Sequence, residues 1–158
     1  MKAEEIMTRN VQSCRPDASL AQAAAIMWDY DCGAMPVVDD SNRVMGMITD
    51  RDIAIAAATK GRRATDITVG EVMSGNVYAC AGDEDVKSAL RTMRRERVRR
   101  LPVISGDGRL VGILSINDIV QRAEESKGRQ VPDISYDDVV STFKAVCERP
   151  RTFQAGTA

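Results

Sequence analysis

No histidine occurs in this sequence of 158 residues, and aromatic residues make up only 4% of it. Histidine is the commonest general base and the commonest metal ligand in proteins. Its absence excludes catalytic arrangements of the Ser-His-Asp and Cys-His kinds, and an enzyme built from this chain would have to rely on Asp52, Asp118 or Lys60. We therefore predict a protein that is not an enzyme, with no catalytic cofactor and no metal site.

An excess of charge of one sign and long apolar runs are also lacking. Lysine and arginine number 22 against 23 aspartates and glutamates, so no net charge attracts nucleic acid. No stretch approaches the ~20 apolar residues that cross a membrane, and the first residues include no apolar signal segment. The four cysteines lie far apart and form no C-x-x-C pair, which predicts reduced, mostly buried thiols in a cytoplasmic protein.

What the sequence does contain is an internal repeat at an offset of 66 residues. Residues 6–53 align with residues 72–119 without a gap, with 13 identities over 48 positions. Chance rarely keeps such a register, so the pattern indicates a duplicated unit. We divide the chain into a first repeat with its linker (1–66), a second repeat (67–126) and a C-terminal helix and tail (127–158).

Each repeat predicts a strand, a helix, two strands joined by a turn and a last helix, which gives an α/β (α+β) fold of two β-α-β-β-α units. Ser19 and Asp85 precede helical apolar runs as N-caps. The elements expected in the first repeat are 11–14, 19–30, 36–38, 43–48 and 50–60. Those expected in the second are 85–96, 101–104, 109–114 and 116–126.

Each repeat closes on a glycine, two apolar residues, a hydroxyl residue, two variable residues and an aspartate, where a strand passes into a helix. The two copies are 46–52 and 112–118. A helix N-terminus offers free N–H groups and a positive dipole end to a phosphate, and an ionised aspartate accepts hydrogen bonds from ribose hydroxyls. Thr49-x-x-Asp52 also has the spacing of a capping box. Because the ending occurs twice in register, we favour a nucleoside-phosphate site over a cap alone.

The paired units resemble a tandem of CBS (cystathionine β-synthase) domains, a Bateman module, over about residues 6–122. The resemblance lies in the M-T/S-x-N-V start, the L/M-P-V-V/I strand and the G-h-h-T/S-x-x-D ending (h is apolar), each present twice. It implies two sheets packed about a pseudo-twofold axis, with two related clefts between the repeats. It also implies a regulatory module that binds AMP, ADP or ATP, with or without Mg²⁺, and modulates a separate client, an enzyme or a transporter.

Carried over by residue, the resemblance assigns Thr49 and Asp52 to one cleft and Ser115 and Asp118 to the other. It also assigns ligand phosphate to the pair before the second L-P-V strand, Arg99-Arg100, where the first repeat has two small residues. We expect the Ser115 cleft to hold this pair, to face residues 32–34 and 8–13, and to favour the more phosphorylated ligand, with Arg51 partly compensating in the other cleft. The predicted ligand-binding residues are Thr8, Val11, Ser13, Cys32, Gly33, Ala34, Thr49, Arg51, Asp52, Arg99, Arg100, Ser115 and Asp118.

The helical runs 20–27 and 53–58 are apolar nearly all round, which requires burial on more than one side. We therefore predict a homodimer, and we assign Met27, Met93 and Trp28 to core positions or to the helix–helix seam. The alternatives are a structural dimerisation module without a ligand and a sensor of S-adenosylmethionine or NADH.

A further helix is predicted at 135–147, capped by Ser135 and ended by Pro150, with a disordered tail at 151–158. We expect it to dock on its own dimer. Its expected apolar stripe is Val139, Val140, Phe143, Val146 and Cys147.

Overall fold

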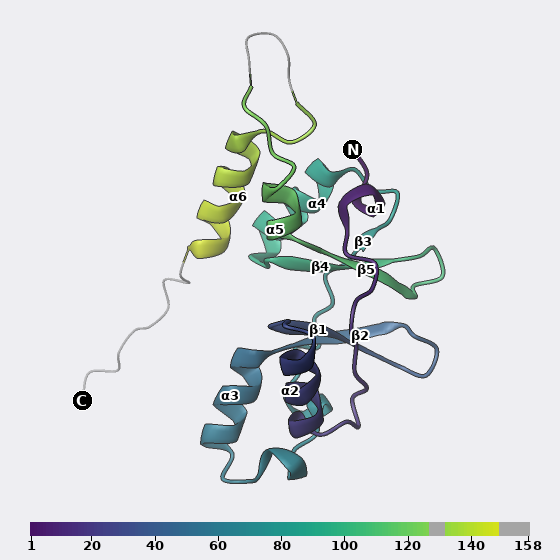
Figure 1. Ribbon diagram of the computed structural model, residues 1–158, viewed down its shortest axis with the longest axis vertical. Helices are drawn as coiled ribbons and strands as arrows, with labels where there is room; N and C mark the ends of the chain where they lie inside the picture. Colours follow the sequence, from purple (N-terminus) through teal and green to yellow (C-terminus); the bar gives the residue numbers. More distant parts are fainter. Residues whose placement is uncertain (127–131, 149–158) are drawn as a thin grey trace, which may run out of the picture.

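The computed structural model describes residues 1–126 and 132–148, and in it two β-sheets lie between two groups of helices (Figure 1). The first repeat holds α2 (Leu20–Asp29), β1 (Ala34–Val38), β2 (Val44–Thr49) and α3 (Asp50–Thr59). The second holds β3 (Cys80–Ala81), α4 (Val86–Glu96), β4 (Arg100–Ile104), β5 (Leu110–Ser115) and α5 (Ile116–Val120). The remaining helices are α1 (Ala3–Ile6), the 3-10 turns η1 (Ala64–Asp66) and η2 (Val69–Glu71), and α6 (Tyr136–Cys147). The mixed fold class and the C-terminal helix are as predicted.

The predicted caps begin the long helices. The Ser19 hydroxyl accepts a hydrogen bond from the Gln22 N–H at 3.2 Å at the start of α2. Asp85 accepts one from the Lys87 N–H at 2.9 Å at the start of α4. These bonds satisfy N–H groups that have no partner within the helix, so both helices begin where the sequence predicts.

The strand registers obey the 66-residue offset. β1 pairs antiparallel with β2, placing Ala34 opposite Thr49, and β4 pairs antiparallel with β5, placing Arg100 opposite Ser115. The sheets meet in a bridge between Arg43 and Arg109, which are themselves equivalent residues. Two equivalent residues pair with each other when a twofold axis passes between them, so the repeats are related by a pseudo-twofold axis.

The entry segment of each repeat packs on the other repeat. Ala3 and Met7 are buried in the core of the second repeat, whereas Ile67 and Val69 are fully buried in the core of the first. Figure 1 shows the N-terminus and α1 beside β5. The two units therefore interlock, and the division of the sequence at residue 66 is not a division between the packed cores.

One expected element is absent from the structure and another is shorter. Residues 11–14 form no strand; Cys14 alone bridges Val37, because the chain leaves the sheet edge after one pair of hydrogen bonds. The last helix of the second repeat ends at Val120, not at residue 126. The Glu124 N–H instead donates to the Ile134 carbonyl at 2.9 Å, which turns the chain toward α6.

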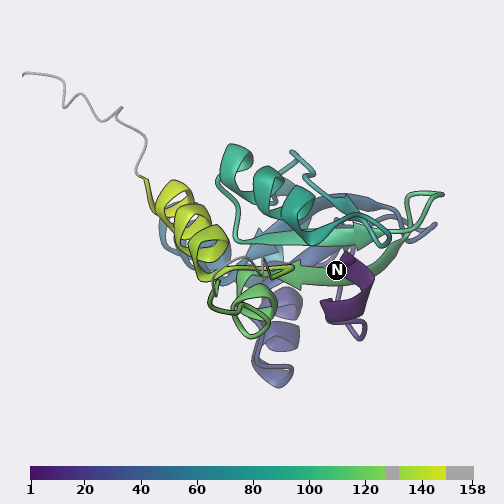
Figure 2. The same cartoon turned by 90° about the horizontal axis from the view of Figure 1, so that it is seen from above.

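α6 packs on its own second repeat, alongside α4 and α5 (Figures 1 and 2). Val139 is buried in that core and Phe143 is packed against it. Thr142, not Val140, completes the buried face; Val140 is 50% exposed and Cys147 is exposed, because they lie on the far side of the helix. Pro150 and the tail 151–158 are outside the described residues.

The helices of the first repeat carry exposed apolar side chains. Met27 is buried, but Trp28 is 87% exposed and Ile55 is 47% exposed. Of the two positions predicted for Trp28, the core or a helix–helix seam, the core is therefore wrong for the single chain. Met93, in contrast, is fully buried, as predicted.

All four cysteines are free, and two of them, Cys14 and Cys80, are buried. Cys32 is half-buried and Cys147 is exposed. None of the helices in residues 1–126 and 132–148 combines the length and the apolar content that a bilayer crossing needs.

Candidate ligand-binding site

The two strand-to-helix endings have the same geometry. Asp52 Oδ2 accepts hydrogen bonds from the Thr49 N–H at 3.0 Å and from the Thr49 hydroxyl at 2.6 Å. Asp118 Oδ2 accepts from the Ser115 N–H at 2.8 Å and from its hydroxyl at 2.6 Å. Both endings are thus complete capping boxes at the first turns of α3 and α5.

The capping role leaves a ligand role open. No hydrogen bond from another residue of 1–126 or 132–148 reaches Oδ1 of Asp52 or Asp118, because every bond to these carboxylates goes to Oδ2. Each side chain is half-buried at a cavity wall. The cap therefore holds each carboxylate in place and leaves Oδ1 able to accept further hydrogen bonds.

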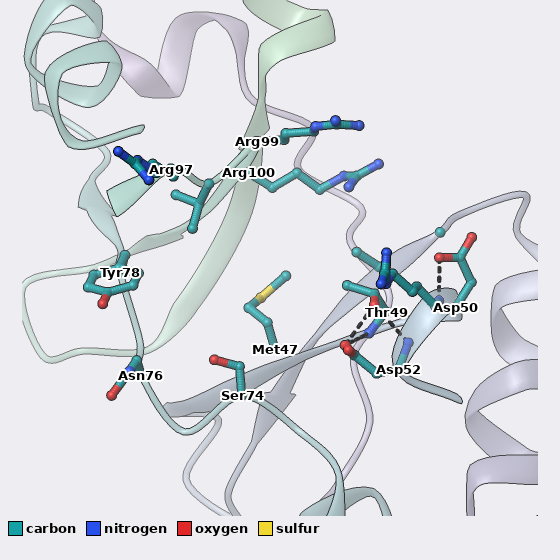
Figure 3. Close-up of a pocket in the computed structure, with 14 residues that line it drawn as sticks. Met47, Thr49, Asp50, Asp52, Ser74, Asn76, Tyr78, Arg97, Arg99 and Arg100 are labelled. Atoms are coloured by element: carbon teal, nitrogen blue, oxygen red, sulfur yellow. Dashed lines mark hydrogen bonds between the residues drawn. The ribbon is translucent and has the colours of Figure 1, made fainter. Parts of the chain in front are cut away.

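Thr49 and Asp52 lie on a cavity of about 610 Å³ that is built from both repeats. Figure 3 shows them on one wall, with Tyr78 and Arg97 on the opposite side and Ser74 and Met47 at its base. The lining residues are Gly33, Ala34, Met47, Thr49, Asp50, Arg51, Asp52, Ser74, Asn76, Tyr78, Arg97, Val98, Arg99 and Arg100. We call this the first cavity.

Ser115 and Asp118 lie on a second cavity, of about 350 Å³. Its lining includes residues of the segments that begin at Thr8 and at Cys32 in the first repeat. Its lining residues are Thr8, Asn10, Val11, Gln12, Tyr30, Asp31, Cys32, Gly33, Ala34, Arg100, Ile113, Ser115, Asn117 and Asp118. Of the predicted residues only Ser13 lines neither cavity.

The two cavities are pseudo-symmetric copies, because most of their residues correspond at the 66-residue offset. Thr8 corresponds to Ser74, and Asn10 corresponds to Asn76. The offset therefore identifies lining residues that motif reasoning missed. Ser74, Asn76, Tyr78 and Arg97 are the equivalents of Thr8, Asn10, Gln12 and Asp31.

Charge distinguishes the cavities. The first is lined by four arginines and two aspartates, Asp50 and Asp52. The second has one arginine, Arg100, and two aspartates, Asp31 and Asp118. Three exchanges between equivalent positions produce most of the contrast: Asp31 for Arg97, Gly33 for Arg99 and Asn117 for Arg51.

We had expected the Ser115 cleft to hold the arginine pair, but the pair is not confined to that cleft. Arg100 lines the second cavity, where it lies opposite Ser115 in the sheet, but Arg99 does not. Both line the first cavity, and Figure 3 shows both side chains extending along its upper side. The physical reason is that β4 begins at the wall between the cavities, so that its first side chains reach either one.

Of the two cavities, only the second has a thiol in its lining, that of Cys32. Burial raises the pKa of Cys32, although the nearby Arg100 guanidinium opposes that shift. The raised pKa favours the neutral thiol form of this side chain. Among residues 1–126 and 132–148, no group of three histidine, cysteine, aspartate or glutamate side chains is placed to hold a metal ion.

Comparison with known proteins identifies the repeats. A family model described as "CBS domain" matches residues 3–59 and 69–125. Hypoxic response protein 1 of Mycobacterium tuberculosis is 34% identical over 145 residues, which cover 92% of this chain and 93% of that protein. A crystal structure of Hypoxic Response Protein I with two coordinated zinc ions has 36% identity and a TM-score of 0.70, and the match covers 77% of this chain and 98% of that one.

Two further relatives differ in size and content. Inosine-5'-monophosphate dehydrogenase of Methanocaldococcus jannaschii is 34% identical over 135 residues, which cover 81% of this chain but only 26% of that enzyme. The CBS domain pair of protein MJ0100, solved in complex with 5'-methylthioadenosine and S-adenosyl-L-methionine, has a TM-score of 0.69 and 27% identity. That match covers 77% of this chain and 94% of the pair.

Proposed function

We propose that this chain, which belongs to the CBS-domain family, is a non-enzymatic regulatory module that binds an adenine nucleotide in its first cavity. The observation that carries the proposal is that Thr49, Asp52 and four arginines line one cavity of about 610 Å³. Asp52 Oδ1 accepts the ribose hydroxyls, and the arginines bind the phosphates through charge-assisted hydrogen bonds.

The charge of the first cavity favours AMP, ADP or ATP over S-adenosylmethionine, whose sulfonium is cationic. Four guanidinium groups stabilise a polyphosphate and repel a cation. The second cavity has two aspartates and one arginine and suits a less anionic adenosine ligand. The ligands in the MJ0100 structure, 5'-methylthioadenosine and S-adenosyl-L-methionine, support adenosine as the common part. We thus propose the more phosphorylated ligand for the Thr49 cavity, the reverse of our expectation from the sequence.

Regulation requires a partner protein that responds to ligand binding. Ligand binding shifts a protein between two arrangements only by its differential affinity for them. A separate client, an enzyme or a transporter, would bind the arrangement that the nucleotide stabilises. We propose that the module acts as a homodimer through the exposed face of α2 and α3, where Trp28 and Ile55 lie. The four free thiols fit the reducing cytoplasm.

Thermal shift and titration calorimetry test the proposal with AMP, ADP, ATP, adenosine, S-adenosylmethionine, NADH and GTP, with and without Mg²⁺. A ligand that binds only the folded state raises the melting temperature. We expect ATP or ADP to bind, Asp52→Ala to remove the tighter event and Asp118→Ala to spare it.

Asp138→Ala is the matched control. It removes the aspartate of another capping box, Ser135–Asp138 in α6, which lines neither cavity. Retained binding in this variant separates ligand contact from the loss of a cap. If no adenine ligand raises the melting temperature of the wild-type protein, the chain is a structural dimerisation module instead. Release of phosphate from ATP by the wild-type protein would contradict the absence of enzymatic activity.

A further inference from the structure

One residue belongs both to the first cavity and to the contact surface of the C-terminal helix. Arg97 ends α4 and lines the cavity, and its Nη2 donates to Glu148 Oε2 at 3.4 Å. Glu148 is the C-cap residue of α6, and α6 lies outside the two CBS matches. The cavity and α6 therefore share a guanidinium group.

Two further observations place α6 near the end of α4 and the start of β4. Phe143 lines a hollow of about 180 Å³ together with Arg99, Arg100 and Ser115. One turn of α4 earlier, Arg94 Nη1 donates to the Ser141 hydroxyl at 3.2 Å. Residues 97–100, which bring arginines to the first cavity, thus lie near α6. Figure 2 shows α6 beside α4, the helix that precedes these residues.

We propose that Glu148 is a specificity-determining residue of the first cavity and that α6 responds to phosphate bound there; this inference rests on the proposed function. A phosphate group that reaches Arg97 meets the Glu148 carboxylate as a like charge and competes with it for the guanidinium. Arg97 and Glu148 have side chains that are 47% and 67% exposed. Exposed ion pairs are weak, so a polyphosphate held by three further arginines displaces Glu148 and loosens the last turn of α6.

The coupling has a definite sign. Glu148 disfavours ligands whose phosphates extend to Arg97 and leaves unphosphorylated adenosine unaffected. By linkage, a ligand that Glu148 disfavours also weakens the docking of α6. The worth of an exposed ion pair limits the effect to about two- to fivefold in affinity.

Titration of wild-type protein, Glu148→Gln, Arg97→Ala and the double variant with ATP and with adenosine tests the proposal. We expect Glu148→Gln to bind ATP about two- to fivefold more tightly and adenosine unchanged, and to have no effect once Arg97 is alanine. The matched control is Asp137→Asn, which removes a charge from the first turn of the same helix and leaves ATP affinity unchanged.

Amide hydrogen exchange of α6 supplies an independent readout. Saturating ATP should speed exchange in the last turn, including the Glu148 N–H that donates to the Lys144 carbonyl, and adenosine should not. If both ligands bind but Glu148→Gln matches wild type, or ATP slows exchange in α6, the inference is overturned. If neither ligand binds, the proposed function fails, and this inference fails with it.

Discussion

A Cβ atom at Gly46 would overlap the carbonyl oxygen of Ser74. Ser74 belongs to the entry segment of the second repeat, and its N–H donates to the Met47 carbonyl at 2.9 Å. The same holds at Gly112, where a Cβ would lie 2.9 Å from the Thr8 carbonyl oxygen. The glycine of each G-h-h-T/S-x-x-D ending therefore allows the two repeats to interlock.

We expect Gly46→Ala to destabilise the protein by about 1–3 kcal/mol, the usual cost of overpacking, because backbone must move. The measurement is the free energy of unfolding in urea. Gly75→Ala is the control, since a Cβ there meets nothing within 4 Å. Equal unfolding free energies for the two variants would show that the crossing segment yields easily.

Arg100 lines both cavities, whereas Arg51 lines only the first. We predict that Arg100→Ala weakens nucleotide binding at both sites and that Arg51→Ala weakens binding at the first alone. Each loss should be about tenfold or more, because hydrogen bonds to charged groups contribute about 1.5–3 kcal/mol. Two-site titration calorimetry with ATP distinguishes the variants, and a loss confined to one site in Arg100→Ala would refute the shared wall.

Trp28 and Ile55 are exposed on α2 and α3, whereas α6 covers part of the equivalent helices of the second repeat. We expect self-association through the open face and predict that Trp28→Glu converts a dimer to a monomer, because the interface would then bury a charge. Light scattering at micromolar concentration measures the mass. Val140→Glu, at an exposed apolar position on α6, should leave the dimer intact; a wild-type monomer would end the hypothesis.

Burial raises the pKa of Cys14 to about 11 and that of Cys80 to about 12. An unfolded thiol loses its proton near pH 8.5, so above that pH the unfolded state binds fewer protons than the folded state. The contribution of these thiols to the free energy of unfolding is fully present below about pH 8.5. It decreases as the pH rises toward the pKa values of the folded state. We predict a smaller alkaline loss in Cys80→Ala than in wild type, measured as the free energy of unfolding at pH 8 and pH 10. Identical losses would mean that the thiol does not couple to folding.

The sequence by itself determined the repeat, the element order and the positions of the caps. These follow from local chemistry: Ser19 and Asp85 satisfy the first N–H groups of their helices, and such bonds depend on residues two or three positions apart. The repeated ending also identified the Thr49/Asp52 and Ser115/Asp118 pairs. Their capping geometry depends only on nearby residues. In both copies of the motif, the pair lies beside a cavity.

Tertiary structure decided the charge of each cavity. Arg97 and Asp31 are equivalent in the repeats but line different cavities, because each cavity joins the strand-to-helix ending of one repeat to segments of the other. The hollow that Phe143 shares with Arg99 and the pairing of Glu148 with Arg97 likewise depend on where α6 docks. That position follows from burial of its apolar face, a non-directional force that selects a surface only when the rest of the fold has formed.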